Sequence, residues 1–433
     1  MRTYTGRNIF KDVVGSLNMI QNDWQLTHKC TGYNNEMLDV VEEFRKEHQQ
    51  WISSGSTERG RTPLTVTQNL WHSTYLEIQR LNKLGIEIEY KELKQIRFRK
   101  KDEGIYSYFD YKHDGRNLMC KVKQRLRINK YYLREGKMLK KDKKDVNASF
   151  YILWARTPEG KYICPNCGNE SILEAFLDGC DYCGSKFHID AFKKKVASFY
   201  LTKDRADDSR DSNGTGKAVN YLATALMSFG LTIVLPFFFF ITIPVFIYSA
   251  VKFVIFAINT DRKGPGRNTM TKLDIWENIP DFSLESFISS VDNKVRALHF
   301  AEREDEVRAI CLCSLNGILN KYENIVACDN GSYLLKDFQI DRGNGFYHIT
   351  VEMDLPLLEL NNNKLSPVKE HIRMILSKKI TSVTGMENDV QIFRCRGCGS
   401  TVSLVEGGIC KYCNTPIEMI NHDWVITQYE TVF

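Results

Sequence analysis

Residues 164–183 read CPNCGNESILEAFLDGCDYC, and residues 395–413 read CRGCGSTVSLVEGGICKYC. In each stretch two CxxC pairs flank a loop, of twelve residues in the first and eleven in the second. A CxxC pair places two sulfur atoms on one tight turn, and two facing pairs form the tetrahedral thiolate site that zinc prefers. The sequence therefore predicts two zinc ribbons, with ligands Cys164, Cys167, Cys180 and Cys183 in the first and Cys395, Cys398, Cys410 and Cys413 in the second.

Both predicted Zn²⁺ sites are expected to be structural, because protein ligands fill all four positions and leave none open for a substrate. Gly168 and Gly399 follow the first pair of each set, where the turn favours a positive φ. The alternatives are disulfides or redox-active CxxC motifs. A redox pair would be single and would lie in a βαβ unit, so the duplicated sets fit it poorly. The remaining five of the 13 cysteines follow no ligand spacing and are interpreted as core thiols: Cys30, Cys120, Cys311, Cys313 and Cys328.

Each cysteine set closes a longer unit of helices and strands. Apolar residues recur at helical spacing over 36–52 and 64–85 in the first unit, and over 282–301 and 304–323 in the second. Strand-like runs follow in both units: 86–90, 95–100, 105–111, 118–128 and 148–156, then 333–340, 346–355 and 371–378. This order predicts an α+β fold class of two cone-like units, each with helices on a curved antiparallel sheet and a zinc ribbon after it. The alternative is ordinary core packing without duplication.

Residues 221–258 are mostly apolar and contain one charged residue, Lys252. About 20 residues are needed to span a bilayer as a helix, so this run predicts a membrane segment. Its length favours a transmembrane or re-entrant helical hairpin over a single long span. Lys and Arg flank both ends of the run, and thiolate ligands favour a reducing compartment, so the soluble parts are expected in the cytoplasm at the cell membrane. No secretory signal precedes them, because residues 1–16 have no apolar core.

The positive charge of the chain is concentrated in its first unit. The whole chain has a formal net charge of +6, and residues 91–144 alone contain 19 Lys or Arg against 7 Asp or Glu. Such a basic surface is expected to lie against anionic lipid headgroups. It also raises the alternative of nucleic-acid binding, but the first ribbon loop is acidic and carries no Lys or Arg, which makes a nucleic-acid partner unlikely on sequence grounds.

The second unit resembles the bacterial Tim-forty-four-like domains. The resemblance rests on FSLESFISSVDNKVRALHFA (282–301), KYENIVACDNGSYLLKDFQI (321–340), the second cysteine set and the closing Asp423, Trp424 and Val425. It covers 281–433 well and 10–201 more loosely, because the first unit has no closing Asp-Trp pair. The resemblance implies a nuclear-transport-factor-like cone with a concave sheet and an apolar pocket. It also implies a membrane-associated binding module without enzymatic activity.

The expected domain order is a first Tim-forty-four-like α+β domain (1–160), a first zinc ribbon with its closing strand (161–201) and a flexible linker (202–219). A helical membrane hairpin (220–259), a linker (260–280), a second α+β domain (281–390) and a second ribbon with its closing strand (391–433) follow. The linker assignment of 202–219 rests on its polar composition.

These features together predict a membrane-anchored, non-enzymatic adaptor that presents two zinc-stapled domains to a protein or lipid partner at the cytoplasmic face. The alternative is a membrane-tethered, nucleic-acid-binding zinc-ribbon protein. An enzyme would need an inward general base, and His72, Asp110 and His348 lie on candidate elements. No nucleophile elbow, phosphate loop, dinucleotide fingerprint or HExxH helix is present in the sequence, so catalysis is not expected.

Overall fold

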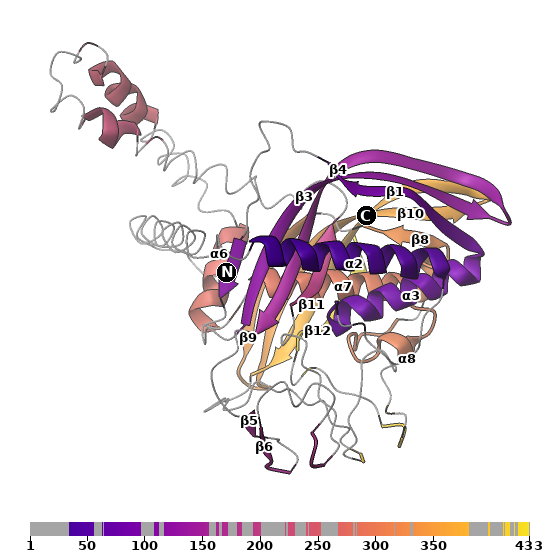
Figure 1. Cartoon of the computed structure of the whole chain (residues 1–433). Coiled ribbons are helices and arrows are strands. Elements are labelled where there is room, and N and C mark those ends of the chain that lie inside the picture. Colours follow the sequence, from indigo (N-terminus) through magenta and orange to yellow (C-terminus); the bar gives the residue numbers. More distant parts are fainter. Residues whose placement is uncertain are drawn as a thin grey trace.

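The fold was analysed in a computed structural model of the chain (Figure 1). The structure describes residues 34–55, 63, 65–96, 108–111, 117–155, 162–163, 167–171, 180–183, 194–200, 221, 224–229, 240, 242–252, 267–279, 282, 284–315, 317–329, 332–380, 397–398, 410, 412–415, 420 and 423–432.

The first unit is built on a five-stranded antiparallel sheet. Its strands run in the order β1-β3-β4-β7, and β2 pairs with β3 beyond the end of β1. Two helices precede the sheet. The elements are α2 (Asn34–Ser54), α3 (Gln68–Leu84), β1 (Ile86–Gln95), β2 (Tyr108–Tyr111), β3 (Asn117–Arg134), β4 (Lys137–Ala155) and β7 (Lys195–Tyr200), with the small pair β5 (Tyr162–Ile163) and β6 (Glu170–Ser171) between β4 and β7.

The second unit repeats this connectivity. Its five-stranded antiparallel sheet has the order β8-β10-β11-β12, and β9 pairs with β10 as β2 pairs with β3. Its elements are α6 (Arg267–Asn278), α7 (Leu284–Phe300), α8 (Glu304–Val307), α9 (Ile318–Lys321), β8 (Ile325–Cys328), β9 (Tyr333–Asp341), β10 (Phe346–Asn361), β11 (Lys364–Lys379) and β12 (Val425–Thr431). Both units are therefore α+β with an antiparallel sheet, as the sequence predicts.

Two local features support the equivalence of the units. The long central hairpin of each sheet closes through two residues with positive φ, Glu135 and Gly136 in the first unit and Asn362 and Asn363 in the second. Such turns match the twist of the strands that they join. The last strand of each sheet also pairs in parallel with a short extended segment, through Val66 and Val196 in the first unit and Cys311 and Ile426 in the second.

Each unit places one long helix against one face of its own sheet. In the first unit, Phe44 of α2 packs against Phe150 and Phe199, with ring centroids 6.1 and 5.1 Å apart. In the second unit, Phe287 of α7 packs against Trp424 at 5.3 Å. These contacts belong to the two main apolar cores, one for each sheet. The stripes that predict helices over 36–52 and 282–301 are thus the core-facing sides of α2 and α7.

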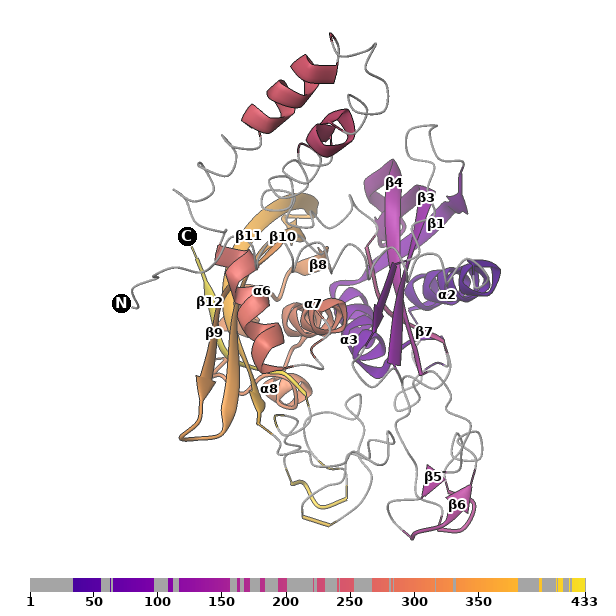
Figure 2. The same cartoon turned by 90° about the vertical axis from the view of Figure 1, so that its left-hand side faces the viewer.

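The two units pack against each other through α3 and α7, which lie between the sheets (Figure 2). The far side of α7 is polar, and the first unit buries it. Ser289 and Asn293 hydrogen-bond Ser198 Oγ and the Ala197 carbonyl at 2.8 and 2.7 Å. Arg296 forms an ion pair with Glu77 of α3 at 2.6 Å, and both side chains are largely buried. The interface is therefore specified by paired polar groups as well as by apolar contact.

Arg80 of α3 is a charged side chain buried in this interface, at 1% exposure. Its guanidinium donates to the carbonyls of Phe300 and Ala301 at 3.3 and 3.0 Å, and also to the carbonyl of Tyr322. Glu302 lies 3.7 Å from Arg80 Nε and supplies the opposite charge. A cation at the C-terminus of α7 satisfies carbonyls that a helix leaves unpaired and complements its dipole.

The predicted helix over 304–323 is wrong in its middle. Among the described residues of this range, helix is confined to α8 and α9, and between them Cys311 forms a parallel bridge with Ile426. Leu312 N–H donates to the Ile426 carbonyl and Ile426 N–H donates to the Ile310 carbonyl, at 2.8 and 2.9 Å. Pairing with β12 satisfies these backbone groups and replaces the helical bonds that the apolar periodicity predicts.

The predicted membrane segment over 220–259 is also corrected. Helix is described there at 221, 224–229, 240 and 242–252, in a part of the chain that projects from the body in Figure 1. None of the described helices has both the length and the apolar character to cross a membrane. The membrane anchor and the cell-membrane location that depended on it are therefore withdrawn.

The basic region 91–144 contributes strands, which the sequence analysis missed between 129 and 147. β3 and β4 pair from Asn117–Ala155 to Arg134–Lys137, with one register shift between Tyr132 and Leu133, so the charged stretch forms one long hairpin. Acidic side chains are interspersed on it: Asp145 lies 2.9 Å from Arg127, and Glu92 lies 2.6 Å from Lys94. Part of the positive charge of this region is thus paired within the sheet.

Candidate metal centres

Three of the four cysteines of each set lie within the described residues, and in both sets they converge. The Sγ atoms of Cys167, Cys180 and Cys183 all lie within 4.8 Å of one another, and so do those of Cys398, Cys410 and Cys413. Each triad is close enough to hold a metal ion. Cys164 and Cys395, the predicted fourth ligands, lie outside the described residues.

The spacing of the sulfur atoms fits tetrahedral thiolate coordination. Cys167 Sγ and Cys180 Sγ are 3.7 Å apart, and the equivalent atoms of Cys398 and Cys410 are also 3.7 Å apart. A tetrahedron with metal–sulfur bonds of about 2.3 Å has sulfur–sulfur edges of about 3.8 Å. In each set, the cysteine that ends the first pair thus meets the cysteine that begins the second pair at the distance that one shared ion requires.

Local backbone structure positions these thiols. Gly168 has φ of 75°, as the sequence predicts for the residue after the first pair. In the second set, Asn414 N–H donates to the Cys410 carbonyl and Cys410 N–H donates to the Thr415 carbonyl, at 2.8 and 2.9 Å. These bonds close the turn that carries Cys413. Cys180 and Cys410 are 2% and 0% exposed, whereas Cys167 and Cys398 are exposed, so each triad has a buried and an open side.

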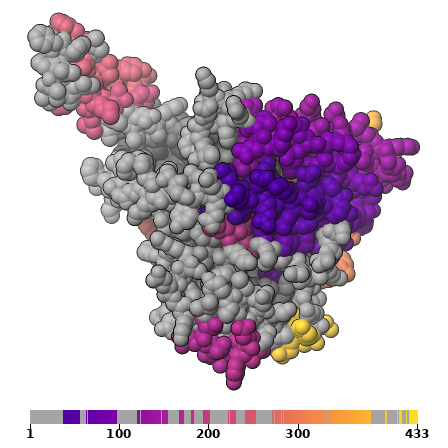
Figure 3. Space-filling view, viewed as in Figure 1, coloured from indigo at the N-terminus to yellow at the C-terminus, as the bar shows by residue number. Residues whose placement is uncertain are grey.

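Both triads lie at the same end of the molecule. In Figures 1 and 2 the chain segments that carry them extend from the lower end of the body, and Figure 3 shows both groups on its lower surface. Each second pair contains a tyrosine between its cysteines, CDYC at 180–183 and CKYC at 410–413. Tyr182 is 80% exposed and Tyr412 is 66% exposed. The sequence analysis missed this repeated exposed aromatic, although its identical place in both pairs was a readable signal.

Of the cysteines outside the sets, Cys120, Cys311 and Cys328 are buried, as predicted for core thiols. Cys313 is only partly buried, and its Sγ lies 2.9 Å from Cys311 Sγ. Cys30 lies outside the described residues.

The residues considered as general bases do not form one site. His72 is 3% exposed within α3, and burial lowers its pKa to about 4. His348 borders a pocket of about 410 Å³ on the second sheet and contacts Ser377 Oγ at 2.7 Å. Ser377 is 1% exposed and shares its hydroxyl with Thr427 at 2.7 Å, so this His–Ser contact does not present a nucleophile. The side chain of Asp110 lies outside the described part.

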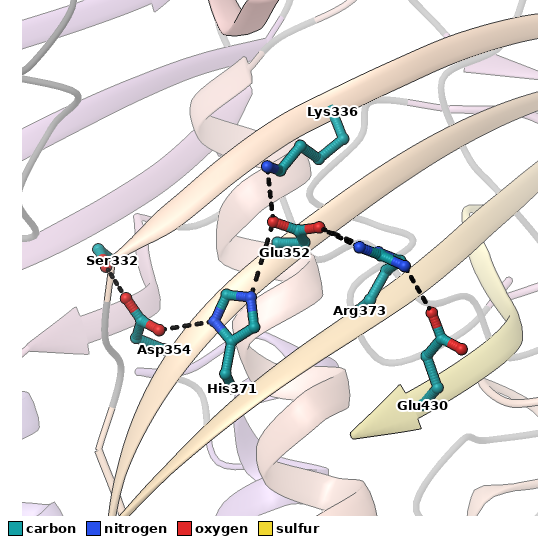
Figure 4. A network of polar contacts seen from close by, with 7 residues as sticks. All are labelled: Ser332, Lys336, Glu352, Asp354, His371, Arg373 and Glu430. Atoms are coloured by element: carbon teal, nitrogen blue, oxygen red, sulfur yellow. Dashed lines mark hydrogen bonds and ion pairs between the residues drawn. The ribbon is translucent and has the colours of Figure 1, made fainter. Parts of the chain in front are cut away.

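A charged network crosses the same face of the second sheet (Figure 4). Glu352 accepts from Lys336 and Arg373, each at 2.8 Å, and Arg373 continues to Glu430 at 3.1 Å. Burial alone would raise the pKa of Glu352, but the hydrogen bonds from Lys336 and Arg373 outweigh it and lower the pKa. His371 bridges Glu352 and Asp354. The network links side chains of β9, β10, β11 and β12 and so ties these strands together.

No family model matches this chain, and neither do the curated proteins or solved structures with which it was compared. The Tim-forty-four-like resemblance remains a prediction from the sequence.

Proposed function

We propose that this chain is a non-enzymatic binding protein whose two α+β units are each fastened by a structural zinc ion and present a protein-binding surface at the end that carries both ribbons. The observation that carries the proposal is the repeated arrangement of a cysteine triad with an exposed tyrosine in its second pair, found twice at one end of the molecule.

The chemistry of the donors supports zinc in a structural role. All described donors are thiols, which suit zinc, and Cys164 and Cys395 would complete both tetrahedra with no open position. Each set precedes the last strand of its sheet, β7 or β12. An ion in each set would fix the chain just before that strand joins the sheet, so metal binding would contribute to folding.

The surface supports binding to a protein. Tyrosine supplies a large contact area with a polar end, and it is enriched where proteins meet. Two such side chains at the same end of the molecule (Figure 3) would contact one partner together. Such a pair gains affinity from simultaneous engagement.

Metal content tests the first part of the proposal. The full chain is expected to carry two equivalents of zinc by elemental mass spectrometry, and Cys180→Ser or Cys410→Ser is expected to lose one equivalent each. Cys328→Ser is the control, because this buried thiol belongs to neither set. Iron in place of zinc, or unchanged zinc in both ligand variants, would contradict the assignment.

Site-specific cross-linking tests the second part. A photoreactive phenylalanine analogue is placed at Tyr182, at Tyr412 or at Met138, which is 60% exposed on the β3–β4 hairpin and serves as the control. Positions 182 and 412 are expected to cross-link to the same protein, and position 138 is not. Identical products from all three positions would overturn the binding surface and would leave the zinc assignment standing.

A second candidate function, nucleic-acid binding, is favoured by one observation. Lys91 and Lys141 lie 6.0 and 5.5 Å from the ring centroid of Tyr131, an arrangement that could receive a phosphate and a stacked base. The acidic partners Asp145 on β4 and Glu92 and Glu89 on the neighbouring strand β1 place it second. A Tyr131→Ala variant with unchanged retention on single-stranded RNA and DNA would remove this candidate.

A further inference from the structure

The segment between α8 and α9 brings two cysteines together outside both metal centres. Cys311 Sγ and Cys313 Sγ lie 2.9 Å apart, whereas a disulfide bond is about 2.05 Å long, so the sulfur atoms need to approach by about 0.9 Å. The residues alternate along an extended segment, which directs both side chains to one side. Sequence spacing alone does not suggest this pair, because CxC is not the spacing of either metal set.

The two thiols differ in access. Cys311 is 3% exposed and belongs to the core of the second unit, whereas Cys313 is only partly buried at the edge of that core. Leu312 between them is 48% exposed, so the segment lies at the surface. The hydrogen bond from Cys311 lowers the pKa of Cys313, and the same bond together with burial raises the pKa of Cys311. Cys313 is therefore the nucleophile of the pair and Cys311 is the resolving thiol.

We propose that Cys311 and Cys313 form a redox-active dithiol that is oxidised by low-molecular-weight disulfides to an intramolecular disulfide. In the first step the Cys313 thiolate attacks one sulfur of the small disulfide, the S–S bond breaks, and one small thiolate leaves. In the second step Cys311 gives its proton to solvent and attacks the Cys313 sulfur, which releases the second small thiolate. Two electrons pass from the cysteine pair to the small disulfide, which becomes two thiols after protonation.

The disulfide between Cys311 and Cys313 would form next to the last strand of the second sheet, β12. Leu312 N–H donates to the Ile426 carbonyl, and the Ile310 carbonyl accepts from Ile426 N–H, so the dithiol lies at the segment that anchors β12. The proposal rests on the short distance between the sulfur atoms of Cys311 and Cys313. It does not depend on the metal assignment or on the protein partner.

The test uses the zinc-supplemented full chain in a series of glutathione redox buffers, followed by alkylation, trypsin and mass spectrometry. Cleavage after Arg308 and Lys321 gives one peptide, AICLCSLNGILNK, which contains both thiols and none of the predicted metal ligands. The expected result is a peptide that resists alkylation and is lighter by two hydrogen atoms as the buffer becomes oxidising. A peptide that stays fully alkylated throughout, or a lasting glutathione adduct in the unsubstituted chain, would overturn the proposal.

Three variants assign the roles. Cys311→Ser is expected to trap glutathione on Cys313, because the resolving thiol is missing. Cys313→Ser is expected to leave Cys311 free of glutathione, because Cys311 is buried. Cys328→Ser, which removes another buried thiol of the same unit, is expected to oxidise as the unsubstituted chain does. Equal glutathione adducts in the first two variants would contradict the assigned order of steps.

Discussion

Several buried charged or titratable side chains hold this molecule together, and each has a specific partner or a specific cost. Arg80 is buried at the junction of the units, where its guanidinium meets three backbone carbonyls and the carboxylate of Glu302. His48 is buried beside Phe44 and Phe199, with ring centroids 5.5 and 4.8 Å away, and its Nε2 has no hydrogen-bond partner among the described residues. The contacts of Arg80 stabilise the fold, whereas the buried His48 makes the stability of the fold depend on pH.

Replacing Arg80 by methionine is expected to lower the free energy of unfolding by about 3 kcal/mol, because the carbonyls at the end of α7 lose their donor and Glu302 loses a partner. Urea denaturation followed by circular dichroism measures the change.

Lys83→Met is the matched control for that variant. Lys83 is also within 3.2 Å of Glu302, but its side chain is 54% exposed. An exposed ion pair contributes at most about 1 kcal/mol, so this variant should stay close to the unsubstituted chain. Equal losses in both variants would show that the charge of Arg80 matters and its carbonyl contacts do not.

Acid is expected to destabilise the fold through His48. Burial, with a smaller effect of Arg296 and Lys130, lowers the pKa of His48 to about 3, below its ordinary value of about 6.5. The neutral form is therefore favoured in the folded state. The stability that this provides is present above pH 6.5 and is lost as the pH falls from there toward 3.

Both proteins are expected to lose unfolding free energy when the pH falls from 7 to 5. The loss should be about 2 kcal/mol smaller in His48→Phe than in the unsubstituted chain. His72, with its pKa lowered to about 4, remains in both proteins and cancels in the comparison. Urea denaturation at the two pH values measures this difference. If both proteins lose the same amount, His48 is already charged or exposed in the folded state.

At the scale of elements, apolar periodicity in the sequence predicts most of the long helices and several of the strands. The helices predicted over 36–52, 64–85 and 282–301 correspond to α2 (Asn34–Ser54), α3 (Gln68–Leu84) and α7 (Leu284–Phe300), and the runs 333–340, 346–355 and 371–378 lie in strands β9, β10 and β11. The cysteine spacing predicts the two triads. These features succeed because each depends on residues close together in the chain.

The elements that were missed depend on contacts between distant parts. The charged stretch 129–147 gives no apolar alternation, yet it pairs as a hairpin because the flanking strands set its register. Residues 304–323 have apolar residues at helical spacing, but Ile310 and Leu312 hydrogen-bond the backbone of Ile426 in β12. The buried polar side of α7, including Asn293 and Arg296, reads as a solvated face until the first unit covers it.

The tight turn between β3 and β4 can be tested by substitution. Gly136 has φ of 72°, and a Cβ there would meet nothing within 4 Å, so the whole cost of Gly136→Ala is backbone strain. A loss of about 1 kcal/mol of unfolding free energy is expected by urea denaturation. Lys137→Ala, at the next exposed position, is the control and should change little. A neutral Gly136→Ala would mean that the turn relaxes to another type.

At the scale of the whole molecule, the two units are expected to unfold as one. Leu76 of the first unit lies in the core of the second, and a third apolar cluster joins Ile78 and Leu81 to Leu358 and Leu360. The hairpin tips also meet, through Arg134 and Asn363 at 2.5 Å. Cooperative units of this kind open with a shared free energy.

Native-state hydrogen exchange read by mass spectrometry measures this coupling. The most protected peptides of β3–β4 and of β10–β11 should report the same opening free energy. Arg80→Met should lower both by the same amount, although Arg80 belongs to the first unit alone. A decrease confined to one sheet would mean that the units open separately, and Lys83→Met again serves as the control.

The position of α7 has a consequence for synthesis on the ribosome. The surface around Tyr200, Ser198 and Ala197 is finished early in the nascent chain, but its cover arrives only when residues 284–302 emerge. Until then the carbonyls that accept hydrogen bonds from Arg80 have not been synthesised, and the surface of the first unit that contacts α7 stays uncovered. Translation must therefore pass α7 and Ala301 before the first unit can reach its final form.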